Sequence, residues 1–329
     1  MKISKKMNKF KKITKRLEGL HYPQEYLCLS KESFQLPLQL SLIEKGNIVA
    51  DVTNHHAFTG YCPLILALSS NYNTHSSEKI TINFSQNPLP KNGSFKLNAT
   101  IAKLELKKIK SINTDDGDIN FYKGVNGEHH FTSLFGQAAG QLYNRLYNYK
   151  PGNVFLAGNL YKQVQIAYSL PRTISLITVE KSGLFNLFPT DLHGQVSANY
   201  YVISLRHGGL ACAQVEASKK ILLSDMNAAA FKMVYSLGKN HMQPLKEALV
   251  FPFSALVSNG FQLPIPEGSV SYKELQLERS FDAGIHRLFV FRIMTSGQVD
   301  SSLQTLAHIH NVYATWRFKQ GIQNTFFLR

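Results

Sequence analysis

The sequence predicts a mainly β protein of the α+β class, in which a β-barrel is decorated by a few helices. Three observations lead to this prediction. Short apolar stretches of strand type dominate the 329 residues, whereas helix-forming stretches are few. Glycine-containing turns separate neighbouring strand-like stretches. A similar succession of elements occurs in each half of the chain, which predicts a tandem duplication.

The predicted strands follow one another along both halves. In the first half, LQLSLIEKGNIVADVT forms two strands around a Lys45-Gly46-Asn47 turn, and PLILALSS and SFKLNATIAKLELKKI follow. In the second half, TISLITVEKSGLFNLF forms two strands around a Lys181-Ser182-Gly183 turn. The later strands are predicted at YYVISLR, KKILLSDM, YKELQLERSF and HRLFVFRIM.

Three helices are predicted, all in the second half: ACAQVEAS, NAAAFKMVYSLGK and SLQTLAHIHNVYATWRFKQ. The second is rich in alanine and has a glycine near its end, which favours a helix. The third is expected to close the chain. Its helical pattern would send the side chains of His308 and His310 in different directions, so we interpret this pair as packing or surface residues.

The internal similarity divides the chain. Two segments of the first half are similar in sequence to segments of the second: LIEKGNIVADVTNHHAFTGYCPLILALS to ITVEKSGLFNLFPTDLHGQVSANYYVISL, and GSFKLNATIAKLELKKI to GSVSYKELQLERSF. FGQAAGQLYNRLYNYKPGN likewise echoes LAHIHNVYATWRFKQGIQN. A boundary near Lys150-Pro151-Gly152 then gives a basic tail (1–20), a first domain (21–150) and a second domain (151–329). Coincidence between two β-rich halves is the alternative.

Composition excludes several classes. Hydrophobic residues make up 44% of the chain, enough for a core, and no run of about 18 apolar residues predicts a membrane-spanning helix. No apolar segment of secretory type follows the basic N-terminus. Cys28, Cys62 and Cys212 are far apart and form no CxxC pair, which favours a reducing cytoplasm and no disulfide or zinc framework.

The formal charge of +15 is concentrated at the N-terminus, where MKISKKMNKFKKITKR has eight Lys or Arg residues and no acid. Apolar residues recur in this tail at helical spacing. The tail is either a solvated extension or a contact surface for acidic lipid or nucleic acid. Because no specific nucleic-acid motif occurs elsewhere, the function is not inferred from charge.

Common catalytic motifs are absent from the sequence: it has no GxGxxG after a strand, no Walker loop, no HExxH and no GxSxG. His55-His56 and His129-His130 are adjacent pairs without a third ligand at suitable spacing, so no metal site is predicted.

One polar stretch, NLFPTDLHG (186–194), interrupts the strands of the second half. Pro189 cannot continue a central strand, and Gly194 permits a close approach. A flat heteroaromatic ligand could use backbone groups here, with Phe188 and Leu192 covering its faces. Hydrogen-bonding side chains are supplied by Thr190, Asp191 and His193. The alternative is a polar loop that Thr190 and Asp191 cap.

Residues of about 155–320 resemble the flavin reductase-like, FMN-binding split-barrel family. Four features match in order: SLPRTISLITVEKSGLFNLFPTDLHG, the strand YYVISLR, the Asp-x-Gly-x-His turn in LQLERSFDAGIHRLFVFRIM, and LAHIHNVYATWRF. The first half resembles this fold only through the internal repeat. The fold class is therefore expected to be tandem FMN-binding split barrels, the first degenerate.

The resemblance implies FMN at a subunit interface, reduced by NADH or NADPH and reoxidised by a small acceptor. Catalysis is assigned to His286, for which a structural role is the alternative. The cofactor-binding residues that it implies are Asn186, Phe188, Thr190, Asp191, Leu192, His193, Ser204, Arg206, His207 and Gly208. Ser204 and Arg206 would hold the phosphate.

The sequence departs from the family after Arg206, where a Ser or Thr is common and this chain has His207-Gly208-Gly209. Backbone N–H groups of the glycines are the proposed substitute. The first half ends its equivalent strand in ALSSNYN, without an arginine. Flavin is therefore expected only in the second half, in a homodimer or an internal pseudo-dimer. A non-catalytic flavin-binding protein and a basic scaffold or interaction protein are the alternatives.

Overall fold

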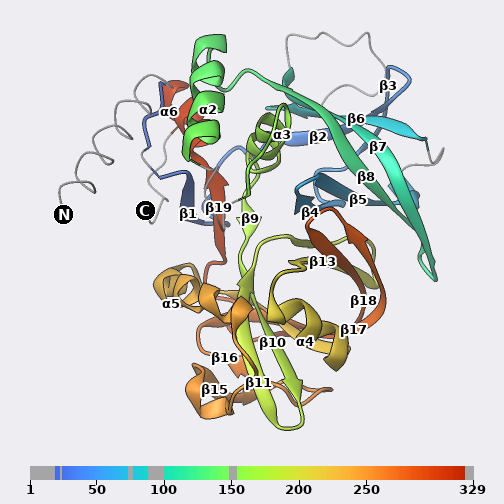
Figure 1. The fold of residues 1–329 in the computed structure, drawn as a ribbon, viewed down its shortest axis with the longest axis vertical. Helices are drawn as coiled ribbons and strands as arrows, with labels where there is room; N and C mark the ends of the chain where they lie inside the picture. Colours follow the sequence, from blue (N-terminus) through green and yellow to red (C-terminus); the bar gives the residue numbers. More distant parts are fainter. Residues whose placement is uncertain (1–18, 23, 73–76, 88–99, 148–153, 323–329) are drawn as a thin grey trace.

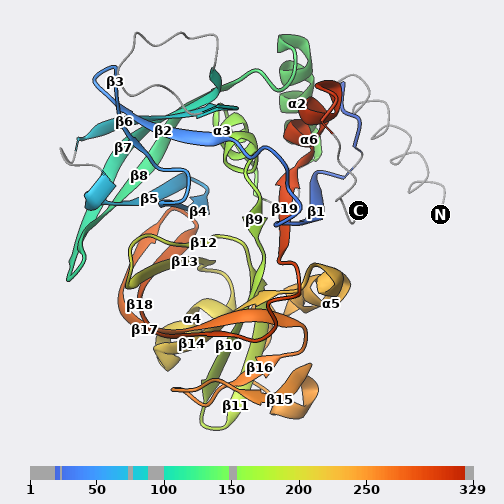
Figure 2. The ribbon, with the colours of Figure 1, turned by 180° about the vertical axis from the view of Figure 1, so that it is seen from behind.

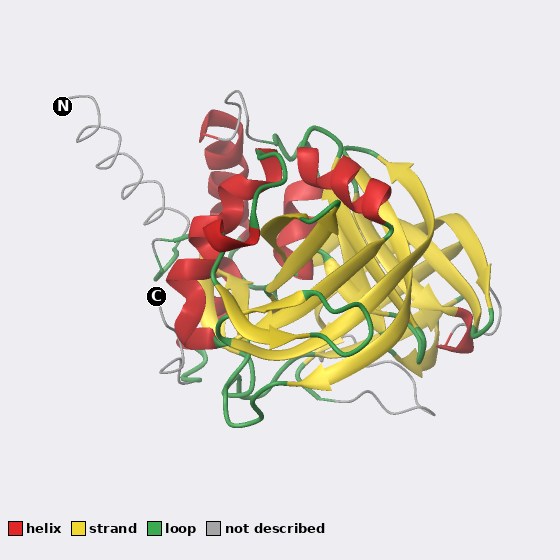
Figure 3. Cartoon of the chain, turned by 90° about the horizontal axis from the view of Figure 1, so that it is seen from below, coloured by secondary structure: helices red, strands yellow, loops and turns green. Residues whose placement is uncertain are grey.

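A computed structural model describes residues 19–22, 24–72, 77–87, 100–147 and 154–322 (Figure 1). Strands form most of this part of the chain (Figure 3). The expected domain boundary at Lys150-Pro151-Gly152 lies outside the described residues. The described residues contain no helix that is long and apolar enough to cross a membrane.

Each half of the chain forms a seven-stranded antiparallel sheet. The first has the order β3-β2-β6-β7-β8-β5-β4 and the second β11-β10-β14-β17-β18-β13-β12. The first sheet comprises β2 (Gln39–Glu44), β3 (Asn47–Asp51), β4 (His56–Tyr61), β5 (Leu64–Ser69), β6 (Lys79–Ser85), β7 (Thr100–Thr114) and β8 (Gly117–His129). The second comprises β10 (Ser175–Lys181), β11 (Leu184–Thr190), β12 (His193–Gln195), β13 (Tyr200–Arg206), β14 (Lys220–Met226), β17 (Ser269–Ala283) and β18 (His286–Gln298).

The two sheets have the same topology. If the strands of each sheet are numbered from one to seven along the chain, both sheets have the order 2-1-5-6-7-4-3. The mainly β class is thus confirmed. In the described residues, neither sheet pairs its two end strands with each other, so each sheet is open and is not a closed, hydrogen-bonded barrel.

Smaller elements join and cover these sheets. A three-stranded sheet, β1-β19-β9, lies between the halves (Figure 2). The short strands are β1 (Tyr26–Ser30), β9 (Arg172–Thr173), β15 (Phe253–Val257), β16 (Pro264–Pro266) and β19 (Leu306–His310). The helices are α2 (Leu134–Tyr147), α3 (Leu160–Ala167), α4 (Leu210–Ser218), α5 (Phe231–Ser236) and α6 (Asn311–Lys319), with 3-10 turns η1 (Ser70–Tyr72), η3 (Ala228–Ala230), η4 (Leu237–Met242) and η5 (Ala248–Val250).

The predicted hairpin turns have the backbone conformation that tight hairpins require. Lys45 and Gly46 have φ of 48° and 84° between β2 and β3, and Ser182 and Gly183 have φ of 56° and 79° between β10 and β11. Two consecutive residues with positive φ match the right-handed twist of the flanking strands. Both turns predicted from the sequence are confirmed.

The predicted closing helix is wrong in its first part. Leu306–His310 forms β19, which pairs with β1 and β9, and the helix begins only at Asn311. The rings of His308 and His310 therefore do not diverge, and both lie about 5 Å from the Tyr26 ring, at 5.3 and 5.4 Å. Pairing with a strand some 280 residues away in sequence overrides the local helical pattern.

The other two predicted helices have different outcomes. The helix predicted at ACAQVEAS is confirmed as α4. The helix predicted at NAAAFKMVYSLGK is divided among η3, α5 and η4.

The core of the first half is built from three stretches of chain. Besides its own strands, it contains Val164 and Ile166 of α3 and Val312 and Ala314 of α6. A second core fills the second half. A third apolar cluster lies between the halves and joins Ile65 and Ala67 to Tyr200 and Val202. The halves therefore share buried surface.

The contacts between the halves are reciprocal. The β17–β18 turn reaches the β4–β5 turn, where Ile285 N donates to Cys62 O at 3.1 Å. The β7–β8 turn reaches the β12–β13 turn, where Asp116 accepts hydrogen bonds from Ser197 Oγ (2.9 Å) and from Asn199 N and Nδ2 (2.8 Å each). Each long hairpin thus touches the corresponding turn of the other half.

A close approach between the halves at Gly194 allows us to predict the effect of adding one methyl group there. A Cβ added at Gly194 would lie 2.7 Å from Ala57 Cβ. Gly194→Ala is expected to lower the free energy of unfolding by about 1–3 kcal/mol because the halves must separate slightly. Urea denaturation measures this change.

A matched control is Gly238→Ala, since a Cβ there would meet nothing within 4 Å. Adding Ala57→Gly to Gly194→Ala is expected to restore part of the lost stability. If Gly194→Ala is as stable as the natural protein, the halves do not pack this closely.

Candidate functional site

A cavity of about 470 Å³ lies between the two halves. Asp191, His193 and Gly194 line it from the second half, and His56 and Phe58 line it from the first. Of the residues that the sequence assigned to a ligand, Asp191 and His193 are therefore brought together at this cavity. Asp191 directly follows β11, and His193 begins β12.

A buried arginine fixes the segment that begins at Asp191. Arg172 Nε and a terminal guanidinium nitrogen donate to Asp191 O at 3.1 and 2.7 Å, and the same terminal nitrogen donates to Phe58 O of the first half. The guanidinium also lies 4.9 Å from the centre of the Tyr168 ring. Arg172 was missed as a site residue. Its sequence signal was a single arginine before an apolar strand.

The Asp191 carboxylate is also paired. Its Oδ2 accepts hydrogen bonds from the Tyr168 hydroxyl and from His308 Nε2, each at 2.8 Å. Burial acts to raise the pKa of Asp191. The hydrogen bond and charge of His308, the charge of Arg172 and the Tyr168 hydroxyl outweigh it and hold this pKa far below its usual range. The carboxylate is therefore ionised and engaged within the protein.

His193 lies in the cavity as a neutral imidazole. Its Nε2 donates to Thr173 O at 3.1 Å, and its Nδ1 accepts from the Tyr201 hydroxyl at 2.7 Å. Burial lowers the pKa of His193 to about 4, and the charge of Arg172 acts in the same direction. At neutral pH the ring is thus a fixed, uncharged part of the wall.

The outward edge of β11 is covered by the residues of η4. The Asn186 amide donates to Gln214 Oε1 (2.8 Å) and Asn240 O (3.0 Å). In return, Asn240 Nδ2 donates to Leu187 O (2.8 Å) and His241 Nε2 donates to Pro189 O (2.7 Å). These backbone groups, which the sequence offered to a flat ligand, are occupied by the chain itself.

The remaining residues of this stretch are buried. Phe188 belongs to the core of the second half. The side chains of Thr190 and Leu192 are also buried.

A second group of the predicted residues gathers at the end of β13. Ser204, Arg206 and His286 share one face of the β13–β18 pair, on which Ser204 Oγ lies 3.3 Å from His286 Nδ1. Tyr61 from the first half covers them: its ring contacts His286 edge-on at 4.9 Å and lies 5.3 Å from the Arg206 guanidinium carbon. Both halves thus contribute to this corner.

The electrostatics of this corner favour an anion. Among the described residues, Arg206 makes no ion pair and no side-chain hydrogen bond, and His286 Nε2 is buried without a hydrogen-bond partner. His207 and Gly208 lead to Gly209, which caps α4 without a side-chain hydrogen bond. His207 faces Asp282 at 3.6 Å. We name Arg206, His286, Tyr61 and the Gly208–Gly209 turn the phosphate corner.

The two parts of the site differ in how they fit a flavin. The phosphate corner has a guanidinium without a carboxylate partner, an unpartnered imidazole nitrogen and a helix N-terminus, which together fit a phosphate group. The edge of β11 has no free backbone groups for the ring along Leu187 and Pro189. Within the described residues, no group of three or more His, Cys, Asp or Glu side chains is placed to hold a metal ion.

The chain matches no family model and no curated protein. Among solved structures, it is similar over 41% of its length to an FMN-binding protein from Thermus thermophilus with bound p-hydroxybenzaldehyde (81% of that chain, 19% identity, TM-score 0.37). It is similar over 50% of its length to the Streptomyces globisporus C-1027 NADH:FAD oxidoreductase SgcE6 (96% of that chain, 13% identity, TM-score 0.41).

A third similar structure is the styrene monooxygenase flavin reductase from Pseudomonas putida S12 (45% of this chain, 92% of that chain, 15% identity, TM-score 0.37). By name, these three structures are an FMN-binding protein, an NADH:FAD oxidoreductase and a flavin reductase. At these values the activity has to be argued from the residues themselves.

The buried His286 predicts a pH dependence of stability. Burial, together with the charge of Arg206, lowers its pKa to about 4 in the folded protein, against about 6.5 when unfolded. Between these values the unfolded chain binds the proton more readily, so stability is lost as pH falls from about 6.5 to 4, by up to about 3 kcal/mol from this residue. Urea midpoints at several pH values measure this loss.

His286→Gln removes the titrating group and keeps a hydrogen-bonding side chain. We expect a smaller loss of stability on acidification in this variant than in the natural protein. A residual loss is expected from His129, whose pKa burial also lowers to about 4. Identical pH dependence in both proteins would show that His286 is not buried in its neutral form.

Proposed function

We propose that the protein is an FMN-binding oxidoreductase of the flavin reductase-like type, with the FMN phosphate held at the phosphate corner. One observation carries this proposal. Among the described residues, Arg206 has no carboxylate partner, although it lies beside the buried, unpartnered Nε2 of His286 and at the N-terminus of α4. The unsatisfied, buried Nε2 of His286 is costly, and a bound phosphate would supply the acceptor that it lacks.

Each residue of the corner has a proposed task. Arg206 binds the phosphate through its planar, two-pronged guanidinium, and the N-terminal amides of α4 add donors. Ser204 orients His286 through its Nδ1. Tyr61 covers the corner from the first half. When bound, FMN would accept a hydride from NADH or NADPH and pass electrons to a small acceptor.

The cavity between the halves is the proposed place for the flat parts of the ligands. Phe58 of the cavity wall and Tyr61 of the phosphate corner belong to the same strand, β4. Neutral His193 and the Phe58 side chain offer it an uncharged wall. Asn186, Phe188, Thr190 and Leu192 support this wall from behind through their buried positions.

We also propose that the two halves arose by duplication and form an internal pseudo-dimer. Both sheets have the same strand order, and the β7–β8 and β17–β18 hairpins have paired register shifts at equivalent places. The reciprocal hairpin contacts resemble those of a two-fold dimer. A tight homodimer in gel filtration would contradict this replacement of a partner subunit. The cytoplasmic location stays a prediction.

Replacing Arg206 tests the phosphate contact directly. Arg206→Ala is expected to weaken FMN binding by about 1–3 kcal/mol, or roughly 5- to 150-fold, because a charge-assisted hydrogen bond is lost. Riboflavin, which has the ring but no phosphate, is expected to bind both proteins equally. Quenching of flavin fluorescence measures both affinities.

Arg279→Ala is the matched control, since Arg279 is exposed on β17 and its side chain donates only to a backbone carbonyl. Equal loss of FMN and riboflavin affinity in Arg206→Ala would contradict a phosphate contact. If the natural protein binds no flavin when FMN is supplied, the proposal fails. The alternative function, a basic scaffold or interaction protein, is then favoured.

Turnover separates an oxidoreductase from a non-catalytic flavin-binding protein. With FMN bound and oxygen excluded, NADH or NADPH is expected to bleach the flavin absorbance near its visible maximum. Unchanged absorbance with both nucleotides would favour the non-catalytic alternative.

A further inference from the structure

Helix α2 exposes its apolar face to solvent. Its buried face is formed by Gly136, Gly140 and Asn144. The opposite face presents an apolar stripe, whose members are exposed by 82%, 68%, 55% and 54%: Leu134, Phe135, Leu142 and Leu146. A surface helix of a globular protein normally buries such a stripe. Figure 1 shows α2 at one end of the molecule, away from the second sheet.

The small residues on the buried side are part of the fold. Asn144 Nδ2 donates to Leu156 O at 2.8 Å, which holds α2 against the following chain. The helix is therefore fixed in this orientation, and its apolar stripe is presented outward. Contiguous exposed apolar side chains of this kind mark an interaction surface.

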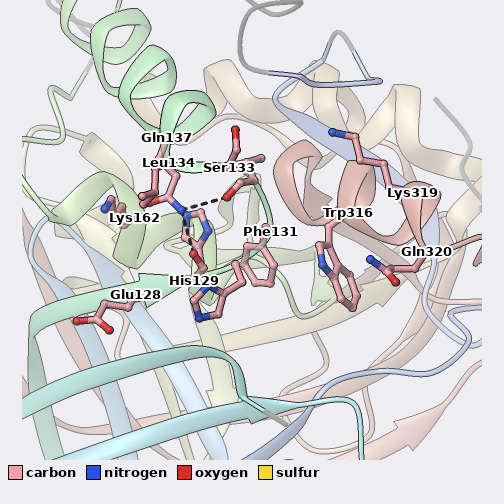
Figure 4. A pocket seen from close by; sticks show the side chains of 12 residues that line it. Glu128, His129, Phe131, Ser133, Leu134, Gln137, Lys162, Trp316, Lys319 and Gln320 are labelled. Carbon is pink, nitrogen blue, oxygen red and sulfur yellow. Dashed lines mark hydrogen bonds between the residues drawn. The ribbon is translucent and has the colours of Figure 1, made fainter. Parts of the chain in front are cut away.

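The surroundings of the apolar stripe are basic. Helix α2 has no acidic residue and has Arg145 in its last turn. A hollow of about 600 Å³ at its foot is lined by Leu134 and by the cations Lys162 and Lys319, with Glu128 as its acidic residue (Figure 4).

The basic tail joins the described chain beside this hollow. A Cβ added at Gly19 would lie 3.4 Å from Lys319 Nζ. Residues 1–16, which lie outside the described residues, have eight Lys or Arg and no acid. These charges precede Gly19 in the chain and add to the basic character of the whole protein.

We propose that α2 and its basic surroundings bind an anionic membrane surface. The apolar stripe enters the boundary between headgroups and acyl chains, and Arg145 and the cations of the hollow attract lipid phosphates. Apolar insertion combined with basic charge gives the two signals that stable attachment to a bilayer surface needs. This surface is independent of the flavin site.

Charge decides against two other partners. A second copy of the chain would bring together two proteins that each have a formal charge of +15, with the basic side chains around α2 facing each other. A nucleic acid would neutralise the cations but would leave the apolar stripe exposed to water. An anionic bilayer satisfies both the charge and the apolar stripe.

Vesicle co-sedimentation of the full chain tests the proposal. Binding is expected to phosphatidylcholine vesicles that contain phosphatidylglycerol, and roughly tenfold weaker binding to phosphatidylcholine alone. The double variant Phe135→Ser/Leu142→Ser is expected to bind the anionic vesicles at least about tenfold more weakly, because less apolar surface inserts. Circular dichroism and the thermal midpoint check that it is folded.

The control variant is Leu249→Ser/Val250→Ser. These residues of η5 in the second half are exposed by 94% and 61%. Their substitution therefore removes a similar amount of apolar surface at another place on the protein. Its vesicle binding is expected to match that of the natural protein within about twofold.

The proposal is overturned if the natural protein does not sediment with anionic vesicles, or if both double variants lose binding equally. It is also overturned if light scattering shows a dimer that Phe135→Ser/Leu142→Ser converts to a monomer, since the apolar stripe would then bind a second copy. FMN affinity is expected to be the same in all three proteins.

Discussion

The arrangement of the two halves depends on one buried cation. Arg172 donates to Asp191 O in the second half and to Phe58 O in the first, while the Asp191 carboxylate accepts from Tyr168 and His308. Transfer of a guanidinium from water is costly unless hydrogen bonds and a nearby opposite charge compensate it. Three sheets meet here, because Arg172 and His308 belong to the β1-β19-β9 sheet, Asp191 links β11 to β12, and Phe58 lies in β4. A shift of either half would break the hydrogen bond from Arg172 to Phe58 O.

This constraint explains the polar stretch that interrupts the strands. Asn186 and Asp191 make their hydrogen bonds within the protein, and His193 is held neutral between Tyr201 and Thr173. The stretch is therefore the structural junction of the halves, and its polarity serves buried contacts. The polar groups that a ligand could bind lie instead on β13 and β18, where Arg206 and His286 face Tyr61. The candidate ligand site is therefore at Arg206 and His286 and not along the hydrogen-bonded polar stretch.

Local sequence predicted the elements but not their long-range partners. The strands and the turns at Lys45-Gly46 and Ser182-Gly183 were predictable, because alternation and turn chemistry act over a few residues. The strand Leu306–His310 was not, because its partner Tyr26–Ser30 lies at the other end of the chain. For the same reason the role of Arg172 escaped notice: its carbonyl partner at Phe58 is 114 residues away. The family resemblance pointed to Arg206 and His286 of the phosphate corner, which stay predictions, whereas nothing in the sequence pointed to Tyr61, which comes from the other half.

Equal topology does not give the two halves equal sites. In the second half, β13 ends in Arg206, and the next residue, His207, donates its N–H to Ile285 O of the β17–β18 turn (3.1 Å). In the first half, β5 is followed by Ser70 and Asn71, whose side chains bond Asp118 N (3.0 Å) and Asp116 O (3.2 Å) of the β7–β8 turn. That turn closes the corner with its own backbone, and no cation is present in the strand or its 3-10 turn to attract an anion. The same turn holds the second half through Asp116. The first half thus has no cation at the position of Arg206 and has the acidic Asp116 nearby, which leaves one phosphate corner in a fold with two equivalent positions.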